Sequence, residues 1–359
     1  MSSRRIVVIH TAFLGDTILA LPMVQALKRH ISDSFVSFVA IPASCALLAN
    51  HPSINQVIEY DKRGKSRGLR GFLRCVKQLK EGRFDTAIVP HRSLRSALLP
   101  YLARIPARIG FSTSAGRFLY TATIRYESEK HEIDRNLQLL APLGIEAPFE
   151  LPLLYPSGED RKAVDQLLAK QFGPTVQPDH LVAIAPGSIW KTKRWPAENF
   201  RRLTELLTDA GENVVLVGSS GDRALCDSVA HGGKEANVLN TAGQLSILQS
   251  AEAIRRTAVL VSNDSAPMHA GVAMRTPVVA IFGATIPEFG FAPAGENDRI
   301  HQTMGLTCRP CSIHGGNECP IRTFDCMHRI APEDVFRSVM DILEGKRTRA
   351  DHLQKGSTT

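Results

Sequence analysis

The chain has 359 residues, of which 43% are hydrophobic and 22% charged, a composition typical of a globular protein with a sizeable core. No apolar run approaches the ~20 residues of a membrane span, and the N-terminus lacks the features of a signal peptide. We therefore expect a cytoplasmic protein of two domains. The formal net charge of +8 indicates an acidic partner.

Basic residues are concentrated in the N-terminal half. Residues 62–130 contain 16 Lys or Arg and four Asp or Glu. Nucleic acid, a phosphorylated glycolipid at an anionic membrane face, or a merely solvated basic surface would each explain this excess. Sparse aromatic residues and the lack of a recognisable binding motif argue against nucleic acid.

Hydrophobic periodicity predicts alternating strands and helices in the first half of the chain. The expected strands are 6–10, 35–41, 56–60 and 86–89, and the expected helices are 16–29, 43–50, 69–80, 93–103 and 132–143. This order predicts a parallel sheet with helices on both faces. Residues 156–178 are rich in Pro and Gly around a helix at 160–171, which predicts a linker after a first domain of residues 1–155.

The same alternation restarts after the linker. The expected strands are 181–185, 213–218, 238–240, 259–263 and a buried run within 276–285, and the expected helices are 197–211, 223–231, 246–256, one after residue 264, and 332–344. We expect a second domain at residues 179–345 and a mobile polar tail at 346–359. The fold class is then α/β, with two doubly wound, Rossmann-like domains facing across a cleft that holds the ligands. Neither domain has the G-x-G-x-x-G fingerprint of a nicotinamide enzyme.

A candidate anion site follows the strand at residues 259–263. Asn263, Asp264 and Ser265 can each accept from free N–H groups at a helix start, and Pro267 suits the first turn because it has no N–H. The remaining N–H groups would then face a phosphate.

A second candidate site is the turn at residues 185–196. Lys191, Lys193 and Arg194 lie there with Ser188, as a pyrophosphate site requires. The alternative is a solvated basic loop, although the following Trp-Pro pair would pin it to the domain. No D-x-D pair occurs in the chain, so we expect the lysines and arginine to replace a divalent metal.

Two carboxylates follow other strand ends. Asp16 comes after the first strand and Gly15, where it can cap a helix, accept a proton from an incoming hydroxyl, or do both. Asp222 follows small turn residues after the strand at 213–218, so it can bind ribose hydroxyls or belong to an ordinary surface turn.

Four clustered cysteines form a C-x2-C-x7-C-x6-C pattern: Cys308, Cys311, Cys319 and Cys326. Because disulfides are disfavoured in the cytoplasm, this pattern predicts a structural zinc or iron site. The alternative is a loop that packs reduced thiols. The other three cysteines are expected to fill core space.

Together these motifs resemble the ADP-heptose:lipopolysaccharide heptosyltransferases, inverting glycosyltransferases of family 9 with the GT-B fold. The resemblance covers residues 4–345 and is carried by the G-D turn at Gly15, the P-G-S to K-R-W-P loop at 186–196, the N-D-S-x-x-x-H cradle at 263–269 and the strand after it. Residues 91–98 and 109–111 look most like the heptosyltransferase II branch.

The resemblance implies that Asp16 is the general base on the acceptor, and charge suggests that Arg92 and Arg95 bind acceptor phosphate or Kdo carboxylate. It implies that Lys193, assisted by Ser188, holds the donor diphosphate. The other implied donor contacts are Asp222 to ribose, Leu245 to adenine, Asp264 to heptose hydroxyls, the N–H groups of Ser265 and Ala266 to phosphate, and His269 to the sugar-phosphate region.

The implied reaction is a single displacement that transfers heptose from ADP-heptose to Kdo2-lipid A or heptosyl-Kdo2-lipid A, with the second heptose preferred. This reaction requires no catalytic cofactor and no nucleic acid. Because the acceptor is a lipid, the resemblance also implies that the protein contacts the cytoplasmic face of the inner membrane peripherally. The alternatives from other classes are a sugar-nucleotide epimerase, another GT-B glycosyltransferase and a nucleic-acid-binding module.

Overall fold

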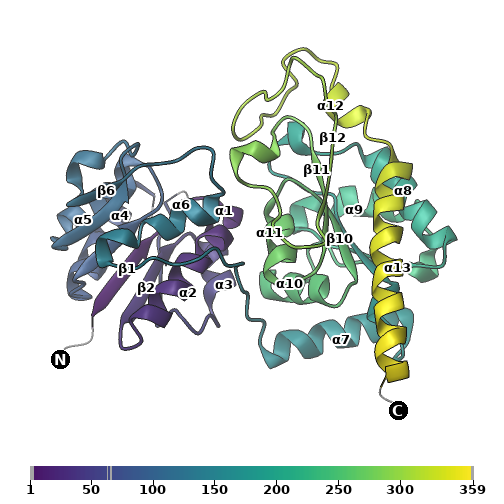
Figure 1. Ribbon diagram of the computed structural model, residues 1–359, viewed down its shortest axis with the longest axis horizontal. Coiled ribbons are helices and arrows are strands. Elements are labelled where there is room, and N and C mark those ends of the chain that lie inside the picture. The colour runs from purple at the N-terminus through teal and green to yellow at the C-terminus, as the bar shows by residue number, and fades with distance from the viewer. Residues whose placement is uncertain (1–3, 63, 65–66, 357–359) are drawn as a thin grey trace. The chain divides into compact units, whose positions relative to one another are not determined.

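The computed structural model describes residues 4–62, 64 and 67–356, with side chains described as far as residue 348. The chain divides into two compact units, Met1–Tyr155 and Pro156–Thr359 (Figure 1). Each unit is built on a six-stranded sheet, and every strand pairing is parallel. Within the described part of the chain, each helix is too short or too polar to span a bilayer.

The sheet of the first unit has the strand order β3-β2-β1-β4-β5-β6. Its strands are β1 (Arg5–Ile9), β2 (Phe35–Ala40), β3 (Gln56–Glu59), β4 (Thr86–Val89), β5 (Ala107–Phe111) and β6 (Ala122–Ile124). The central strands β1 and β4 are rich in Val, Ile and Ala and almost entirely buried, as expected when helices cover both faces of a parallel sheet.

The helices of the first unit are α1 (Leu14–Leu19), α2 (Leu21–His30), α3 (Pro42–Leu48), α4 (Gly68–Glu81), α5 (Leu94–Leu102) and α6 (Glu132–Gln138). The single helix expected at residues 16–29 is in fact two, because α1 ends at Leu19 and Pro22 occupies the first turn of α2. Helix α6 stops before Pro142, and the expected remainder is a 3-10 turn at Ala141–Leu143.

The sheet of the second unit repeats the same topology in the order β12-β11-β10-β7-β8-β9. Its strands are β7 (Leu181–Ala185), β8 (Asn213–Leu216), β9 (Val238–Asn240), β10 (Val259–Asn263), β11 (Val278–Phe282) and β12 (Arg299–Gln302). The expected doubly wound α/β architecture is confirmed in both units.

The helices of the second unit are α7 (Gly158–Phe172), α8 (Ala197–Asp209), α9 (Arg223–Ala230), α10 (Ile247–Arg255), α11 (Ala266–Ala273), α12 (Asp325–His328) and α13 (Pro332–Gly356). Helix α7, which lies in the expected linker, packs against α10 of this unit. Asp165 on α7 pairs with Arg256 at 2.6 Å.

Helix α13 differs from the sequence-based expectation at its C-terminal end. The pattern predicts a helix ending at Glu344 and a tail from residue 346, whereas the helix continues to Gly356. Two side chains beyond the expected end hold it to the unit. Lys346 donates to the Ala258 carbonyl at 2.7 Å, and Arg347 pairs with the buried Glu212 at 2.7 Å. Residues 357–359 of the expected tail lie outside the described residues.

In each sheet the strand order reverses between two neighbouring strands, β1 and β4 in the first unit and β7 and β10 in the second. In open α/β sheets, ligands bind beside the loops that follow the two strands at such a reversal. The candidate site residues lie mainly on these loops.

Candidate active site

The loop between β7 and α8 is anchored by Trp195. This side chain is 1% exposed, and its ring meets Phe200 edge-on with the centroids 4.9 Å apart. Its indole N–H donates to the Ile330 carbonyl at 3.1 Å. The expected anchoring of this loop is confirmed, so a freely solvated loop is excluded.

Asn263 joins the two loops at the switch point of the second sheet. Its side-chain oxygen accepts from the Trp195 N–H and its amide donates to the Pro186 carbonyl, both at 2.9 Å. The expectation that Asn263 accepts from N–H groups at the start of α11 is therefore wrong. Ser265 is the N-cap of that helix, and its side chain makes no capping hydrogen bond.

Lys193, which is partly buried, and Asp264, which is buried, form an ion pair across this switch point. The Lys193 ammonium lies 2.6 Å from the Asp264 carboxylate, and the two side chains are 13% and 7% exposed. The Thr285 hydroxyl, which follows β11, donates to the same carboxylate oxygen at 2.7 Å. Asp264 therefore orients Lys193, a role that the sequence pattern did not indicate.

The start of α11 lies beside this pair. The first N–H groups of a helix have no acceptor within it and form its positive end, which favours an anion at Ser265 and Ala266. The Ser265 hydroxyl donates to the Gly187 carbonyl at 3.4 Å, which places this helix start against the β7 loop. Ser188 is buried on that loop, and its carbonyl accepts from the Arg194 guanidinium at 2.7 Å. His269 is buried one turn along α11.

Asp222 lies directly beside Gly187. A Cβ atom at position 187 would come within 2.6 Å of the Asp222 carboxylate, so the loops after β7 and β8 touch, and a larger residue at 187 would require the Asp222 side chain to move. Asp222 accepts from the Ser219 N–H at 3.0 Å and from its hydroxyl at 2.6 Å. Leu245, half-buried, comes after β9 and immediately before the N-cap of α10. The loops after β7, β8, β9 and β10 thus bring the expected donor residues to one sheet edge.

Asp16 occupies the start of α1 in the first unit. It is the third residue of that helix, not its N-cap, and its carboxylate accepts from the Phe13 N–H at 3.2 Å. The expected N-cap role is therefore wrong, although the half-buried carboxylate still accepts from the N–H of Phe13, which is the N-cap residue. The expected role of Asp16 as a proton acceptor stays a prediction.

A polar cluster that sequence reasoning missed lies at the switch point of the first sheet. His91 contacts the hydroxyls of Thr11 at 3.3 Å and Ser96 at 2.8 Å, and Lys62 donates to Thr11 at 3.3 Å. Burial, and then the Lys62 charge, lower the pKa of His91 to about 4. Burial also lowers the pKa of His10 to about 3, with further contributions from His91 and Lys62. Both imidazoles are therefore neutral at pH 7, and the cluster carries the charge of Lys62.

The two arginines expected at the acceptor follow β4. The Arg92 guanidinium lies 4.0 Å from the centroid of the Tyr126 ring, a cation–π contact that orients it. Arg95 is exposed on α5, with its guanidinium 5.9 Å from the Phe72 ring centroid. Position and charge allow both to meet an anionic acceptor.

The four clustered cysteines do not form a metal site among the described residues, where no three His, Cys, Asp or Glu side chains converge as ligands. The predicted zinc or iron ligand set is therefore not found in this arrangement. Cys326 packs in the hydrophobic core of the second unit, and burial raises its pKa to about 11, whereas Cys311 is exposed. All four are free thiols.

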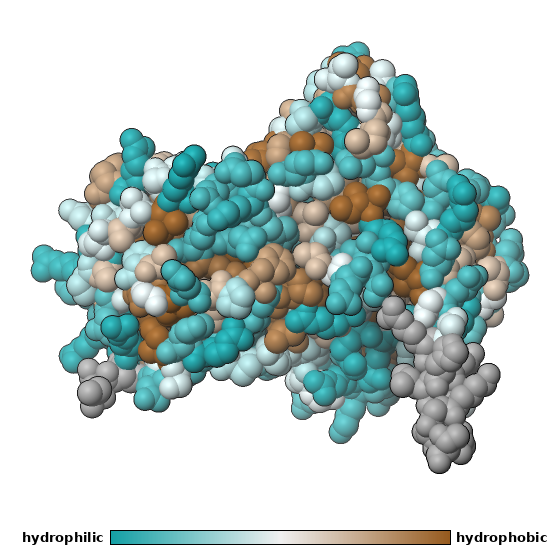
Figure 2. Space-filling model, in the orientation of Figure 1, coloured by the Kyte–Doolittle hydropathy of each residue, from teal (hydrophilic) through white to brown (hydrophobic). Residues whose placement is uncertain are grey.

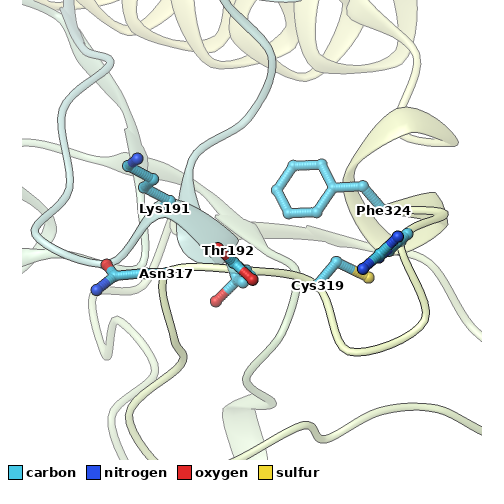
Figure 3. Close-up of a pocket in the computed structure, with 7 residues that line it drawn as sticks. Lys191, Thr192, Asn317, Cys319 and Phe324 are labelled. Carbon is cyan, nitrogen blue, oxygen red and sulfur yellow. The ribbon is translucent and has the colours of Figure 1, made fainter.

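A cavity of about 520 Å³ lies where the cysteine-rich segment meets the β7–α8 loop (Figure 3). Lys191 and Thr192 line it from the loop, and Asn317, Cys319 and Phe324 line it from the segment. The sequence pattern gave no indication that these two stretches, more than 100 residues apart, are in contact.

Comparison with known proteins decides the family. The sequence model of glycosyltransferase family 9 (heptosyltransferase) matches residues 72–319. The chain belongs to this family. The chain is 27% identical over 299 residues to lipooligosaccharide heptosyltransferase 2 of Haemophilus ducreyi, a match that covers 79% of this chain and 85% of that protein.

Two solved structures share the fold of this family 9 chain. A family 9 glycosyl transferase from Veillonella parvula aligns with a TM-score of 0.85 at 23% identity, covering 96% of this chain and 98% of the other. ADP-heptose LPS heptosyltransferase II of Escherichia coli aligns with a TM-score of 0.78 at 23% identity, covering 96% and 99%. The expected GT-B fold is confirmed.

Proposed function

We propose that this family 9 glycosyltransferase transfers L-glycero-D-manno-heptose from ADP-heptose to the lipopolysaccharide inner core, with the second heptose as the preferred addition. The observation that carries the proposal is the edge of the second sheet, where Lys193, Asp264 and the start of α11 meet. A partly buried cation beside the positive end of a helix suits a diphosphate. The relative from Haemophilus ducreyi, named a heptosyltransferase 2, supports the choice of sugar and branch.

The donor roles follow from this edge. Lys193, the Ser188 hydroxyl and the N–H groups of Ser265 and Ala266 bind the diphosphate, and they stabilise the charge that develops as ADP leaves. Asp264 orients Lys193 and meets the heptose hydroxyls. The remaining donor contacts are Asp222 with ribose, Leu245 with adenine and His269 with the sugar-phosphate region.

Asp16 is the proposed general base. Its carboxylate takes the proton of the attacking acceptor hydroxyl as that oxygen bonds to the anomeric carbon of heptose. The bond from that carbon to the ADP oxygen breaks in the same step, and ADP departs with its charge neutralised by Lys193. One displacement inverts the anomeric centre, so a β-linked donor gives an α-linked product.

Arg92 and Arg95 are proposed to bind phosphate or Kdo carboxylate on the acceptor. The contact with the Tyr126 ring holds the Arg92 guanidinium in one orientation. Arg95 is exposed and can reach a phosphate or carboxylate of the acceptor. Because His10 and His91 are neutral, Lys62 supplies the positive charge of the polar cluster near Thr11. This charge favours an anionic acceptor at the same edge of the first sheet.

Helix α4 supports the proposed peripheral contact with the cytoplasmic face of the inner membrane. Leu69 and Leu73 are 70% and 50% exposed, and they share the helix with the exposed Arg70 and Arg74. Apolar patches also lie among hydrophilic side chains on the visible face of the first unit (Figure 2). Leucines flanked by arginines favour an anionic lipid surface.

Vesicle flotation tests this contact. The chain should float with vesicles that contain phosphatidylglycerol and not with phosphatidylcholine alone, and the Leu69→Ser/Leu73→Ser variant should lose most of this binding. Met304→Ser, which changes an exposed apolar residue of the second unit, is the control. Equal binding by both variants and the parent protein would contradict the proposed surface.

ADP release tests the reaction itself. ADP-heptose is incubated with the enzyme alone, with Kdo2-lipid A and with heptosyl-Kdo2-lipid A. We expect ADP release only with an acceptor, and faster with the heptosylated one. Consumption of ADP-heptose without acceptor would indicate an epimerase, and no release with either lipid would overturn the proposal.

A further inference from the structure

The cysteine-rich segment is hydrogen-bonded to the residue before Lys193. The Thr192 hydroxyl accepts from the Gly316 N–H at 2.8 Å and donates to the Gly316 carbonyl at 3.0 Å, and the Thr192 N–H donates to that carbonyl at 3.0 Å. Thr192 is buried at this contact. Figure 3 shows its side chain next to Asn317 and Cys319 of the segment.

The same turn also packs on Lys193 itself. Gly315 has a φ of +82°, and a Cβ atom there would lie 3.1 Å from Cγ and 3.4 Å from Cε of Lys193. The Ser312 hydroxyl closes the turn, because it donates to the Gly315 carbonyl at 3.0 Å and accepts from the Gly315 N–H at 2.9 Å. The turn therefore meets the aliphatic stem of Lys193, while Asp264 holds the ammonium.

We propose that residues 312–316 position Lys193 for the donor diphosphate, with Thr192 and Gly315 as positioning residues. The inference rests on the proposed role of Lys193 in donor binding. A free lysine side chain has about 2 kcal/mol of rotamer entropy to lose when it binds a ligand. A turn packed along the stem removes part of that freedom in advance, which raises affinity without any contact between the turn and the donor.

Matched variants separate this role from general stability. Thr192→Val keeps the side-chain volume and removes the hydroxyl, leaving the Gly316 N–H without its acceptor. Thr192→Ser keeps the hydroxyl. Thr204→Val is the control, because Thr204 is also buried in this unit and donates to a backbone carbonyl, that of Phe200, within α8. Thermal unfolding confirms that each variant is folded.

ADP affinity is measured by calorimetry. Thr192→Val should weaken ADP binding about 5- to 10-fold, because Lys193 regains part of the rotamer freedom that the turn removes in the parent protein. Thr192→Ser and Thr204→Val should stay within about twofold. If Thr192 acts through Lys193, then Thr192→Val should add less than about twofold to the effect of Lys193→Ala. Unchanged affinity in Thr192→Val, or full additivity with Lys193→Ala, would overturn the proposal.

A second readout does not depend on the donor. Acetic anhydride labels lysines according to access and charge, and peptide mass spectrometry compares Lys193 with the exposed Lys170 of α7. The ratio of labelling at Lys193 to labelling at Lys170 should rise several-fold in Thr192→Val and Gly315→Ala.

If Lys193→Ala keeps full ADP affinity, the proposed role of Lys193 in donor binding is wrong. The labelling ratio then still decides whether the turn positions this lysine, and an unchanged ratio would refute it.

Discussion

Lys193 and Asp264 form an ion pair in which water reaches little of either side chain. The ammonium and carboxylate are 2.6 Å apart, and the Thr285 hydroxyl donates to the same carboxylate. Removing the lysine alone should therefore have two consequences, because it deletes a cation from the donor site and leaves a buried carboxylate without its partner.

Lys193→Met should weaken ADP binding by about 10- to 100-fold and lower the free energy of unfolding by about 2–4 kcal/mol. The double variant Lys193→Met/Asp264→Asn should regain most of the lost stability, because the unpaired charge is gone, but none of the ADP affinity. Urea unfolding and calorimetry measure the two quantities. If the double variant is no more stable than Lys193→Met, the loss of stability does not come from an unpaired carboxylate at Asp264.

Asp16→Asn should lower turnover by about 10²- to 10⁴-fold, the usual contribution of a general base. Asparagine can still accept a hydrogen bond from the Phe13 N–H, so α1 should keep its start. ADP affinity should be unchanged, because the proposed donor contacts lie in the second unit. ADP release at saturating acceptor gives the rate, and near-normal turnover would exclude Asp16 as the base.

Gly187→Ala should disturb the proposed ribose contact. The new methyl group would lie 2.6 Å from the Asp222 carboxylate, so that either Asp222 or the β7 loop has to move. We expect the Asp222 carboxylate to move and to lose its hydrogen bonds to Ser219, at a cost of about 1 kcal/mol in unfolding free energy, together with weaker ADP binding.

Gly221→Ala is the matched control on the neighbouring loop. A Cβ atom there has Ser219 Oγ as its nearest neighbour at 3.6 Å, an ordinary contact. Its ADP affinity should match that of the parent protein. If both alanine variants bind ADP normally, the contact between Gly187 and Asp222 does not shape the donor site.

The sequence predicts the central strands best. Residues 6–9 of β1 and 259–261 of β10 are buried runs of Val, Ile and Leu, a pattern typical of central strands in a parallel sheet. Strands β5, β6 and β12 were not predicted, and of these β6 and β12 are edge strands. Strand β12 is a polar, half-exposed stretch of four residues, and Arg108 and Gly110 interrupt β5. Such strands form because an adjacent strand of the sheet offers hydrogen bonds. The hydrophobic periodicity of the strand's own sequence does not indicate this pairing.

The site shows the same division. The Lys193 loop and the start of α11 each have a local pattern that indicates an anion site, and both were expected from the sequence. The contacts that join them were not, because Asn263 meets Trp195 across 68 residues and Thr192 meets Gly316 across 124. Contacts of this length depend on the sheet order and on loop paths, so only the folded structure reveals that Asp264 holds Lys193.

The buried His10 should make the protein sensitive to acid. Burial, His91 and Lys62 lower its folded-state pKa from 6.5 to about 3, so the unfolded chain binds the proton more tightly. The stability that neutral His10 contributes is then complete above about pH 6.5 and is lost as pH falls toward 3. Between pH 6.5 and 4.5 the loss should be about 2–3 kcal/mol, at 1.36 kcal/mol for each unit. His10→Leu should flatten the fall in urea-unfolding free energy by this amount, and the exposed His231→Leu should not. Parallel pH profiles for the two variants would show that His10 is accessible to protons in the folded state.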